Sequence, residues 1–393
     1  MPGDPVTTFA TDATDSAGPS ESLGGAFATG AAQRAVDARR LLARTRDHRW
    51  PRSSRLRDAA MRATLIALLR RVRRDQFVVS ERLPGRPAST MRFGNPGELS
   101  GEIVVHDTRA YAAVMMEGSI GLGRGYLEGW WSTDDPVAVV QVIIRNLDRL
   151  DRYRNGWERA TGPLSDRIRR ALPRHTRDRN KDDIGAHYDI GNDFFALFLD
   201  DTMTYSSAIF PTPDATLLEA SRHKYDVLLR KLGVTEHHHL LEIGTGWGGM
   251  AIRAATTIEC RVTTTTISDE QLREATRRVA DAGVRDRVTL LGDDWRDLTA
   301  GELAGTYDRL VSIEMIEAVD WRDYDEFFST IERCLAPDGL AAIQAICLPD
   351  SRWERAKNTE DFIRRFVFPN GFLPSIGRLV KYRPPKEQVK DGV

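Results

Sequence analysis

A glycine-rich loop carries the strongest chemical signal in the chain. An apolar run at residues 240–243 leads directly into Gly244-Thr245-Gly246-Trp247-Gly248-Gly249. Because glycine has no Cβ, backbone N–H groups in such a loop can approach a ligand closely at the mouth of a parallel sheet. Gly244, Gly246 and Gly249 also satisfy the dinucleotide-binding pattern G-x-G-x-x-G. A plain tight turn between a strand and a helix is the simpler alternative.

Two features favour S-adenosylmethionine over a nicotinamide dinucleotide as the ligand of this loop. A dinucleotide site needs an acidic residue about 20 positions further on, for the ribose hydroxyl, and the strand predicted at residues 261–267 has none. Glu242 precedes the glycines, where its charge would repel a pyrophosphate but need not repel a cationic ligand, and S-adenosylmethionine carries a sulfonium and an ammonium group. We therefore predict S-adenosylmethionine as the cofactor and keep an NAD(P)-dependent oxidoreductase as the alternative.

Polar residues after the next two predicted strands are candidates for the same site. Ser268 and Gln271 are spaced as a capping box for the following helix, and they are equally placed to contact the ligand. Asp294 can accept a hydrogen bond from an adenine amino group, and the Trp295 indole can cover the adenine face. A surface aspartate and a core tryptophan are the alternatives for this pair.

The elements that must position these residues alternate between strand and helix. Helical spacing predicts helices at residues 217–232, 268–282 and 324–335. Apolar or β-branched runs predict strands at residues 239–243, 261–267, 287–291, 307–313 and 340–347. We expect the last strand to be buried and to follow a turn at Pro337-Asp338-Gly339. Such alternation is typical of a doubly wound parallel sheet, so we predict an α/β fold.

Upstream of this sheet the pattern predicts a smaller α+β domain. We expect strands at residues 76–80 and 102–106, a loop at 92–101 and a helix at 136–150. Residues 34–74 contain fourteen Arg, no Lys and three acidic residues, and apolar residues recur at helical spacing over 56–69. A basic amphipathic helix can rest on anionic lipid. An Arg-rich helix packed on its own domain is the equal alternative.

Composition excludes several classes of protein. A net charge of −1 argues against a globally basic nucleic-acid binder. No apolar run reaches the about 18 residues that a membrane span requires, and residues 1–30 lack the order of a signal peptide. Three scattered cysteines predict no disulfide framework, and adjacent residues His237-His238-His239 would point to opposite faces of a strand, so we predict no metal site. We expect a cytoplasmic protein.

Several ordered motifs resemble the family of cyclopropane-fatty-acyl-phospholipid synthases and mycolic acid methyltransferases. They lie at residues 103–107, 126–131, 183–195, 203–206, 241–248, 312–317 and 366–375. The resemblance implies a Rossmann-like class I methyltransferase sheet with a smaller amino-terminal domain. It also implies transfer of a methyl group from S-adenosylmethionine to the cis double bond of an unsaturated phospholipid acyl chain, through a carbocation. A homodimer and a peripheral position on the inner face of the membrane follow from the same resemblance.

The resemblance also assigns roles to individual residues. It places Glu317 close to the reacting centre, and His187 and Tyr188 in the segment that covers the donor. The donor itself would contact Tyr205 and Ser206 at its methionine end, the loop from Glu242 through Gly244, Gly246 and Gly248, the stretch Thr266, Ser268 and Gln271 at its ribose, and Asp294 and Trp295 at its adenine. A helix-start pair is the alternative for His187 and Tyr188.

Two positions depart from the cyclopropane pattern. Ser207 stands where those enzymes usually have Cys, and Gln344 stands where they have His. Both belong to the region that holds a bicarbonate base in those relatives, so the sequence leaves open whether this chain uses bicarbonate. The Gln344 variant, with residues 314–319, resembles the actinobacterial branch that makes methylene-branched stearate. A reductase partner would then convert the methylene group into a methyl branch.

The domain boundaries follow from these patterns and from the resemblance. We expect disorder at residues 1–33, the basic helix and α+β lipid-facing domain at 34–160, a basic linker at 161–182, the methyltransferase domain at 183–378 and a polar tail at 379–393. Members of the family continue beyond residues 366–375 with two more strands, whereas the likeness here stops near Arg378. We therefore expect those carboxyl-terminal strands to be missing and activity to be weak. A methyltransferase for a small molecule and a non-catalytic lipid-binding protein are the remaining alternatives.

Overall fold

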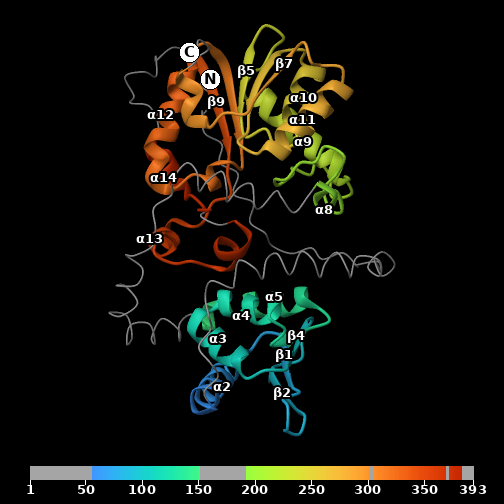
Figure 1. The fold of residues 1–393 in the computed structure, drawn as a ribbon, viewed down its shortest axis with the longest axis vertical. Helices are drawn as coiled ribbons and strands as arrows, with labels where there is room; N and C mark the ends of the chain where they lie inside the picture. The colour runs from blue at the N-terminus through green and yellow to red at the C-terminus, as the bar shows by residue number, and fades with distance from the viewer. Residues whose placement is uncertain (1–54, 151–191, 301–304, 369–370, 383–393) are drawn as a thin grey trace.

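The computed structural model describes residues 55–150, 192–300, 305–368 and 371–382, and these form two layered units (Figure 1). The amino-terminal unit, blue to green, comprises residues 55–150. The second unit, yellow-green to red, begins at residue 192 and contains the glycine-rich loop. The disorder predicted for residues 1–33 and the linker predicted at 161–182 lie outside the described residues. None of the described helices has the length and apolarity to cross a bilayer.

A four-stranded mixed sheet forms the amino-terminal unit, in the order β2-β1-β3-β4. β1 pairs antiparallel with β2 and parallel with β3, and β3 pairs antiparallel with β4. The two predicted strands are confirmed, but the predicted loop at 92–101 is wrong at both ends, because β2 continues to Gly94 and β3 begins at Ser100. An edge strand with half of its side chains exposed lacks the apolar alternation that marks a buried strand. The strands are β1 (Gln76–Glu81), β2 (Ser89–Gly94), β3 (Ser100–Val105) and β4 (Trp131–Ser132).

Four helices cover this sheet: α2 (Arg55–Leu69), α3 (Arg109–Glu117), α4 (Ser119–Leu127) and α5 (Pro136–Arg145). α5 starts as its sequence predicts, with Asp135 as N-cap accepting from the Ala138 N–H at 2.9 Å. It ends at Arg145, earlier than the predicted 150. The side chain of Asn146 then bonds to the backbone of Arg73 and Arg74, which ties the end of the helix to the loop before β1.

The basic helix α2 packs on its own domain. Its apolar side chains Met61, Leu65 and Ile66 contact the core of the amino-terminal unit. Arg62 forms a two-point ion pair with Glu81 of β1, with N–O distances of 2.5 and 2.7 Å. Of the two alternatives for this helix, the structure therefore favours the packed one, because the apolar side is already occupied by protein.

Glu81 is the polar centre of this packing. It is 6% exposed and accepts hydrogen bonds from Arg62, Tyr111 and Ser89. Burial alone raises the pKa of Glu81, but these three hydrogen bonds outweigh it and lower the pKa to about 2. A carboxylate with a lowered pKa stabilises the fold above its unfolded pKa, and the contribution is lost as the pH falls toward the folded pKa.

We predict that Glu81→Gln lowers the free energy of unfolding by about 2 kcal/mol at neutral pH. The deficit should shrink as the pH falls from 4.5 toward 2, because the wild-type carboxylate is then protonated too. Urea unfolding of both proteins across this range measures it. Glu98→Gln is the matched control, since Glu98 also pairs with an arginine but its side chain is 84% exposed. An equal deficit at all pH values would contradict the prediction.

The second unit is built on a parallel sheet of five strands in the described residues, in the order β7-β6-β5-β8-β9. The first strand along the chain lies in the middle, so the order reverses between β5 and β8. This is the doubly wound arrangement predicted from the sequence. The strands are β5 (His239–Ile243), β6 (Arg261–Thr265), β7 (Val288–Leu291), β8 (Tyr307–Ile313) and β9 (Leu335–Gln344).

Helices on both faces of the sheet enclose two separate cores (Figure 1). Leu240 of β5 points to one core and Leu241 to the other, as alternation along a strand requires. The first core contains residues of α9 (Leu217–Lys231), α10 (Gly249–Thr257) and α11 (Asp269–Asp281). The second contains residues of η1 (Trp295–Ala300) and α12 (Tyr324–Cys334). The helix predictions are confirmed to within a residue or two at each end.

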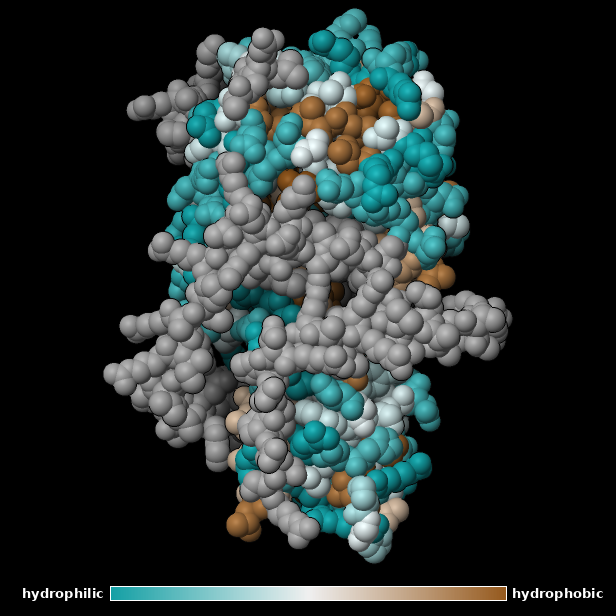
Figure 2. Space-filling view, viewed as in Figure 1, coloured by the Kyte–Doolittle hydropathy of each residue, from teal (hydrophilic) through white to brown (hydrophobic). Residues whose placement is uncertain are grey.

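The last strand, β9, differs from its prediction. It runs from Leu335 to Gln344, continues through the predicted turn with a register irregularity opposite β8, and ends three residues early. It is also an edge strand, with Leu340 51% exposed, whereas the sequence predicted burial. An apolar strand is expected to be covered on both faces, and periodicity cannot reveal which strand lies at the edge. Figure 2 shows apolar residues gathered over this unit on the viewed face.

The segment after β9 closes over the end of the sheet and contacts the amino-terminal unit. It contains η4 (Asp350–Arg352), α13 (Trp353–Lys357), the π-helix η5 (Ile363–Val367), α14 (Ile376–Leu379) and η6 (Val380–Tyr382). Buried Arg124 of α4 pairs with Glu117 and lies 5.9 Å from the Phe366 ring centre. At Gly123 a Cβ would come within 2.1 Å of the Phe362 ring, so a side chain there would separate the two units.

Candidate active site

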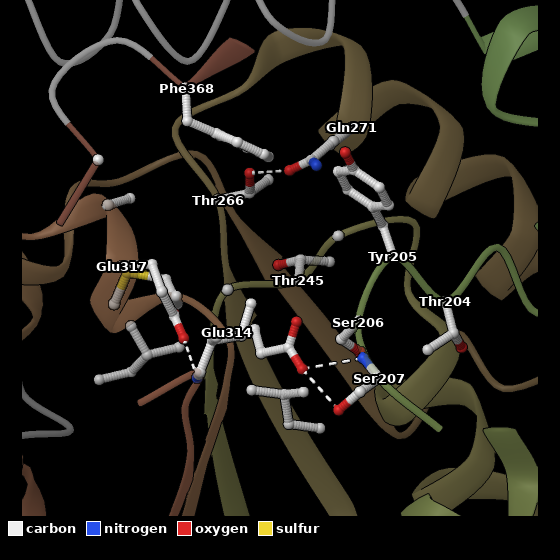
Figure 3. A pocket seen from close by; sticks show the side chains of 18 of the residues that line it. Thr204, Tyr205, Ser206, Ser207, Thr245, Thr266, Gln271, Glu314, Glu317 and Phe368 are labelled. Carbon is white, nitrogen blue, oxygen red and sulfur yellow. Dashed lines mark hydrogen bonds between the residues drawn. The ribbon is translucent and has the colours of Figure 1, made fainter. Parts of the chain in front are cut away.

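A cavity of about 840 Å³ opens at the carboxyl ends of β5, β6 and β8. This is the switch point of the sheet, where ligands of open α/β folds bind. The glycine-rich loop forms one wall, and residues 203–207 and the segment after β9 form others. Figure 3 shows Thr266 and Gln271 on one side of the space and Glu317 on the other, with Tyr205 and Phe368 beside it.

The backbone of the loop requires glycine. Gly244 and Gly246 have φ angles of +103° and +52°, which L-residues rarely adopt. At Gly249 a Cβ would lie 2.7 Å from the Tyr225 hydroxyl. Gly244 and Gly246 line the cavity, whereas Gly248 is the N-cap of α10 and does not. The loop therefore brings its backbone close to the cavity, as the sequence predicted, through Gly244, Gly246 and Gly249.

The candidate ribose residues separate into two roles. Ser268 caps α11 by accepting from the Gln271 N–H at 3.3 Å, and it does not line the cavity. The Gln271 side chain does not close a capping box but accepts from the Thr266 hydroxyl at 2.8 Å. Thr266 and Gln271 both line the cavity, so the Gln271 amide nitrogen is available for a ligand hydroxyl. Ser268 therefore takes the capping role, and Gln271 is the residue placed to contact the ligand.

Asp294 and Trp295 line the cavity beyond Gln271. Trp295 is only 8% exposed and packs edge-on against Phe327, so it also belongs to the second core. Arg296 pairs with Asp294 at 3.2 Å and lies over the Trp295 ring at 4.3 Å. This arginine was missed by sequence reasoning, although it directly follows the pair that it orients.

Glu242 lies beneath the glycine-rich loop, fully buried. Its carboxylate accepts from the Thr264 hydroxyl at 2.7 Å, and Thr264 is bonded in turn to Thr245 of the loop at 2.7 Å. Burial raises the pKa of Glu242 to about 8, against the opposing effects of Thr264 and of the positive charge of Lys224. A cation bound in the cavity would favour the ionised carboxylate.

Lys224 is a buried cation that the sequence interpretation missed. It lies on the apolar side of α9, donates to the Ser206 hydroxyl and is fully buried. Burial lowers its pKa to about 8, while the charges of Glu314, Asp200 and Glu242 act in the opposite direction. A lysine on the core-facing side of an amphipathic helix was the available signal. Through this bond Lys224 positions Ser206, one of the predicted donor contacts.

Four polar side chains gather at the other side of the cavity. Glu317 is held by the Ile346 N–H at 2.5 Å, and its second oxygen is buried without a hydrogen-bond partner in the described structure. Burial raises the pKa of Glu317 to about 7, and the neighbouring charge of Glu314 adds to the shift. Gln344 donates to Glu314 at 2.9 Å and to Ser207 at 3.1 Å. Glu314 was not among the predicted site residues, and His187 and Tyr188 lie outside the described residues.

This fold and site define a class I S-adenosylmethionine-dependent methyltransferase. The first strand lies in the middle of the parallel sheet, a glycine-rich loop follows it, and no acidic residue stands at the end of β6, where a dinucleotide ribose would need one. The polar side chains of Gln271 and Asp294 continue the site toward β7. The nicotinamide alternative is therefore not favoured.

Residues 175–387 match the family model of mycolic acid cyclopropane synthetase, and the chain belongs to this family. It is 37% identical over 341 residues to a tuberculostearic acid methyltransferase of Mycobacterium tuberculosis, covering 84% of this chain and 77% of that protein. It is 30% identical over 312 residues to the cyclopropane-fatty-acyl-phospholipid synthase of Escherichia coli strain K12, covering 75% and 72%. The family match extends past Arg378, where the sequence interpretation had placed its end.

Two solved structures also align with part of this chain. The cyclopropane synthase MmaA2 from Mycobacterium tuberculosis aligns with a TM-score of 0.46 and 30% identity, over 54% of this chain and 74% of that one. A mycolic acid cyclopropane synthase solved with SAH and CTAB aligns with the same TM-score and 33% identity, over the same shares of the two chains.

We predict that Gln271→Ala weakens binding of S-adenosylhomocysteine about tenfold, because one hydrogen bond to a buried ligand group is lost. Isothermal titration calorimetry measures the change. Gln141→Ala, at an exposed position of α5, is the matched control and should bind as the wild type does. Equal affinity of the two variants would contradict a ribose contact by Gln271.

Donor binding should also release a proton from Glu242. The free protein holds Glu242 largely protonated below its pKa of about 8, and the cationic methionine end of the donor favours the carboxylate. We expect calorimetry near neutral pH, in buffers of different ionisation enthalpy, to show up to one proton released on binding S-adenosylmethionine. Glu242→Gln should release none. The same release from both proteins would exclude Glu242 as its source.

Proposed function

We propose that this methyltransferase alkylates the cis double bond of an unsaturated acyl chain carried by a phospholipid. The observation that carries the proposal is the lining of the cavity. Beside the polar residues Thr266 and Gln271, many apolar side chains line the same space. They are Phe198, Leu199, Ile346, Leu348, Phe368, Phe372 and Leu373. An acyl chain suits a cavity with this apolar lining, whereas a small polar substrate would leave much of it unused.

The chemistry follows from the weak nucleophilicity of an alkene. The methyl group must be held in line with the double bond in a space that excludes water. Transfer breaks the S–CH₃ bond, forms a C–CH₃ bond and leaves a positive charge on the neighbouring carbon of the chain. The stacked rings of Tyr205 and Phe368, with centres 6.1 Å apart, and the carboxyl groups of Glu314 and Glu317 are already in place to stabilise that charge.

Loss of a proton then decides the product. If the methyl carbon loses a proton and bonds to the cationic carbon, the product is a cyclopropane. A hydride shift onto the cationic carbon, followed by proton loss from the methyl group, gives a methylene group. Ser207 and Gln344 support the methylene product, as does the identity to a tuberculostearic acid methyltransferase. A separate reductase would then be needed for a methyl branch, and we propose one as a partner, together with a homodimer on the family resemblance.

A phospholipid substrate requires access to a membrane surface. On α5, Val137, Val140 and Ile144 are 63%, 49% and 60% exposed, and their spacing places them on one face of the helix. An exposed apolar row of this kind supports contact with lipid. We propose that the chain works as a peripheral protein on the cytoplasmic face of the membrane.

The function is tested with methyl-labelled S-adenosylmethionine and vesicles of oleoyl phospholipid. We expect label in the acyl chains, in a product that ozone cleaves, because a methylene group is an alkene and a cyclopropane is not. Vesicles of stearoyl phospholipid, which lack the double bond, are the control. A labelled product that resists ozone would refute the methylene branch. Labelling of saturated vesicles, or of no lipid, would refute alkylation of the double bond.

A further inference from the structure

The oxygen of one carboxylate collects three hydrogen bonds at the reacting end of the cavity. Glu314 Oε1 accepts from the Ser207 N–H at 2.8 Å, from the Ser207 hydroxyl at 2.9 Å and from the Gln344 amide at 2.9 Å. Figure 3 shows this carboxylate between Glu317 and Ser207. Its other oxygen has no hydrogen-bond partner among the described residues, and Glu314 lines the cavity. One oxygen is therefore anchored, while the other faces the substrate space.

The backbone of Glu314 is held just as firmly. It follows the end of β8 with a φ angle of +48°, a left-handed conformation that is costly for a residue with a Cβ. The Glu314 N–H donates to the Gln344 carbonyl at 2.8 Å. Gln344 thus binds both the backbone and the side chain of Glu314. Such a strained position persists only where the surroundings determine it, which points to a function.

The donors around Glu314 belong to the two positions that depart from the cyclopropane pattern. The Ser207 hydroxyl and the Gln344 amide both donate, and the amide does so at every pH because it does not titrate. The resemblance implies that this region holds bicarbonate, a small carboxylate-like base, in relatives of the cyclopropane type. Here the same region contains a carboxylate that is part of the chain.

Glu317, the other carboxyl group nearby, is less suited to take the proton. One of its oxygens is bound by the Ile346 N–H, and the other is buried without a partner in the described structure. Burial and the charge of Glu314 raise its pKa to about 7. Two neighbouring carboxyl groups with different surroundings commonly divide the acid and base roles between them. Three donors from two segments fix the orientation of the Glu314 carboxylate, whereas a single N–H holds Glu317, so Glu314 is the better positioned base.

We propose that Glu314 is the catalytic base of this enzyme and fills the place of bicarbonate; this rests on the proposed function. After methyl transfer and the hydride shift, the unanchored Glu314 oxygen takes one proton from the methyl carbon. The C–H electron pair becomes the second bond of the methylene group, which neutralises the cation. The carboxylate becomes a carboxylic acid, and its proton passes to solvent when the product leaves.

The test compares Glu314→Gly and Glu314→Gln with the wild type in buffer freed of carbon dioxide. Glycine suits the left-handed backbone, so we expect Glu314→Gly to melt at or above the wild-type temperature and to bind S-adenosylhomocysteine normally. The methylene lipid product should fall about 100-fold in both variants, the usual contribution of a general base. Bicarbonate or formate should restore it several-fold in Glu314→Gly, which leaves room for a small anion. The exposed Glu332→Gln on α12 is the matched control.

The outcomes separate the base from the function itself. If the wild type methylates no lipid, the proposed function fails. If the wild type is active but itself depends on added bicarbonate, or if Glu314→Gly makes the product at the wild-type rate without an added anion, Glu314 is not the base. A loss in Glu314→Gly that neither anion restores would assign Glu314 a merely structural role and overturn the proposal.

Discussion

Burial of the Glu242 carboxylate directly below the glycine-rich loop is the constraint on which the site depends. Removing a carboxylate from water is costly unless hydrogen bonds or an opposite charge compensate. Thr264 supplies one hydrogen bond, and Lys224 supplies a buried positive charge in the same region. The sulfonium and ammonium groups of the donor can offset the remaining free-energy cost of ionising Glu242. Because burial raises the pKa of Glu242 to about 8 in the free protein, a bound cation is favoured by allowing this carboxyl group to ionise, whereas a pyrophosphate would oppose its ionisation.

The other side of the cavity contains two further carboxyl groups, those of Glu314 and Glu317. Glu314 and Glu317 both line the cavity, but their surroundings differ. Three donors anchor Glu314, whereas a single N–H holds Glu317, whose second oxygen is buried without a partner in the described structure. The segment after β9 closes this end and contacts α4 through Arg124 and Phe366. The packing between the two units therefore also determines how well the reacting end excludes water.

Much of the fold follows from local patterns. Apolar or β-branched runs located β5, β6, β7 and β8, and helical spacing located the helices around them, because these elements are half or fully buried. The sequence patterns gave wrong predictions for two edge strands, β2 and β9, because the burial of an edge strand depends on its place in the sheet. β2 was missed because an exposed edge strand has weak alternation. β9 was expected to be buried, but it lies at the edge, and strand order depends on contacts far apart in the chain.

The sequence by itself determined the glycine-rich loop, the acidic residue before it and the polar residues after β6 and β7, because each lies within a few positions of a strand end that local pattern can locate. Only the tertiary structure decided which of these residues reach the cavity: Gln271 does, and Ser268 does not. It alone revealed Lys224 and the convergence of Ser207, Glu314 and Gln344. Those three come from separate segments. Glu314 and Gln344 meet because the neighbouring parallel strands β8 and β9 end at the same edge of the sheet. The loop that contains Ser207, 137 positions before Gln344, packs against that edge.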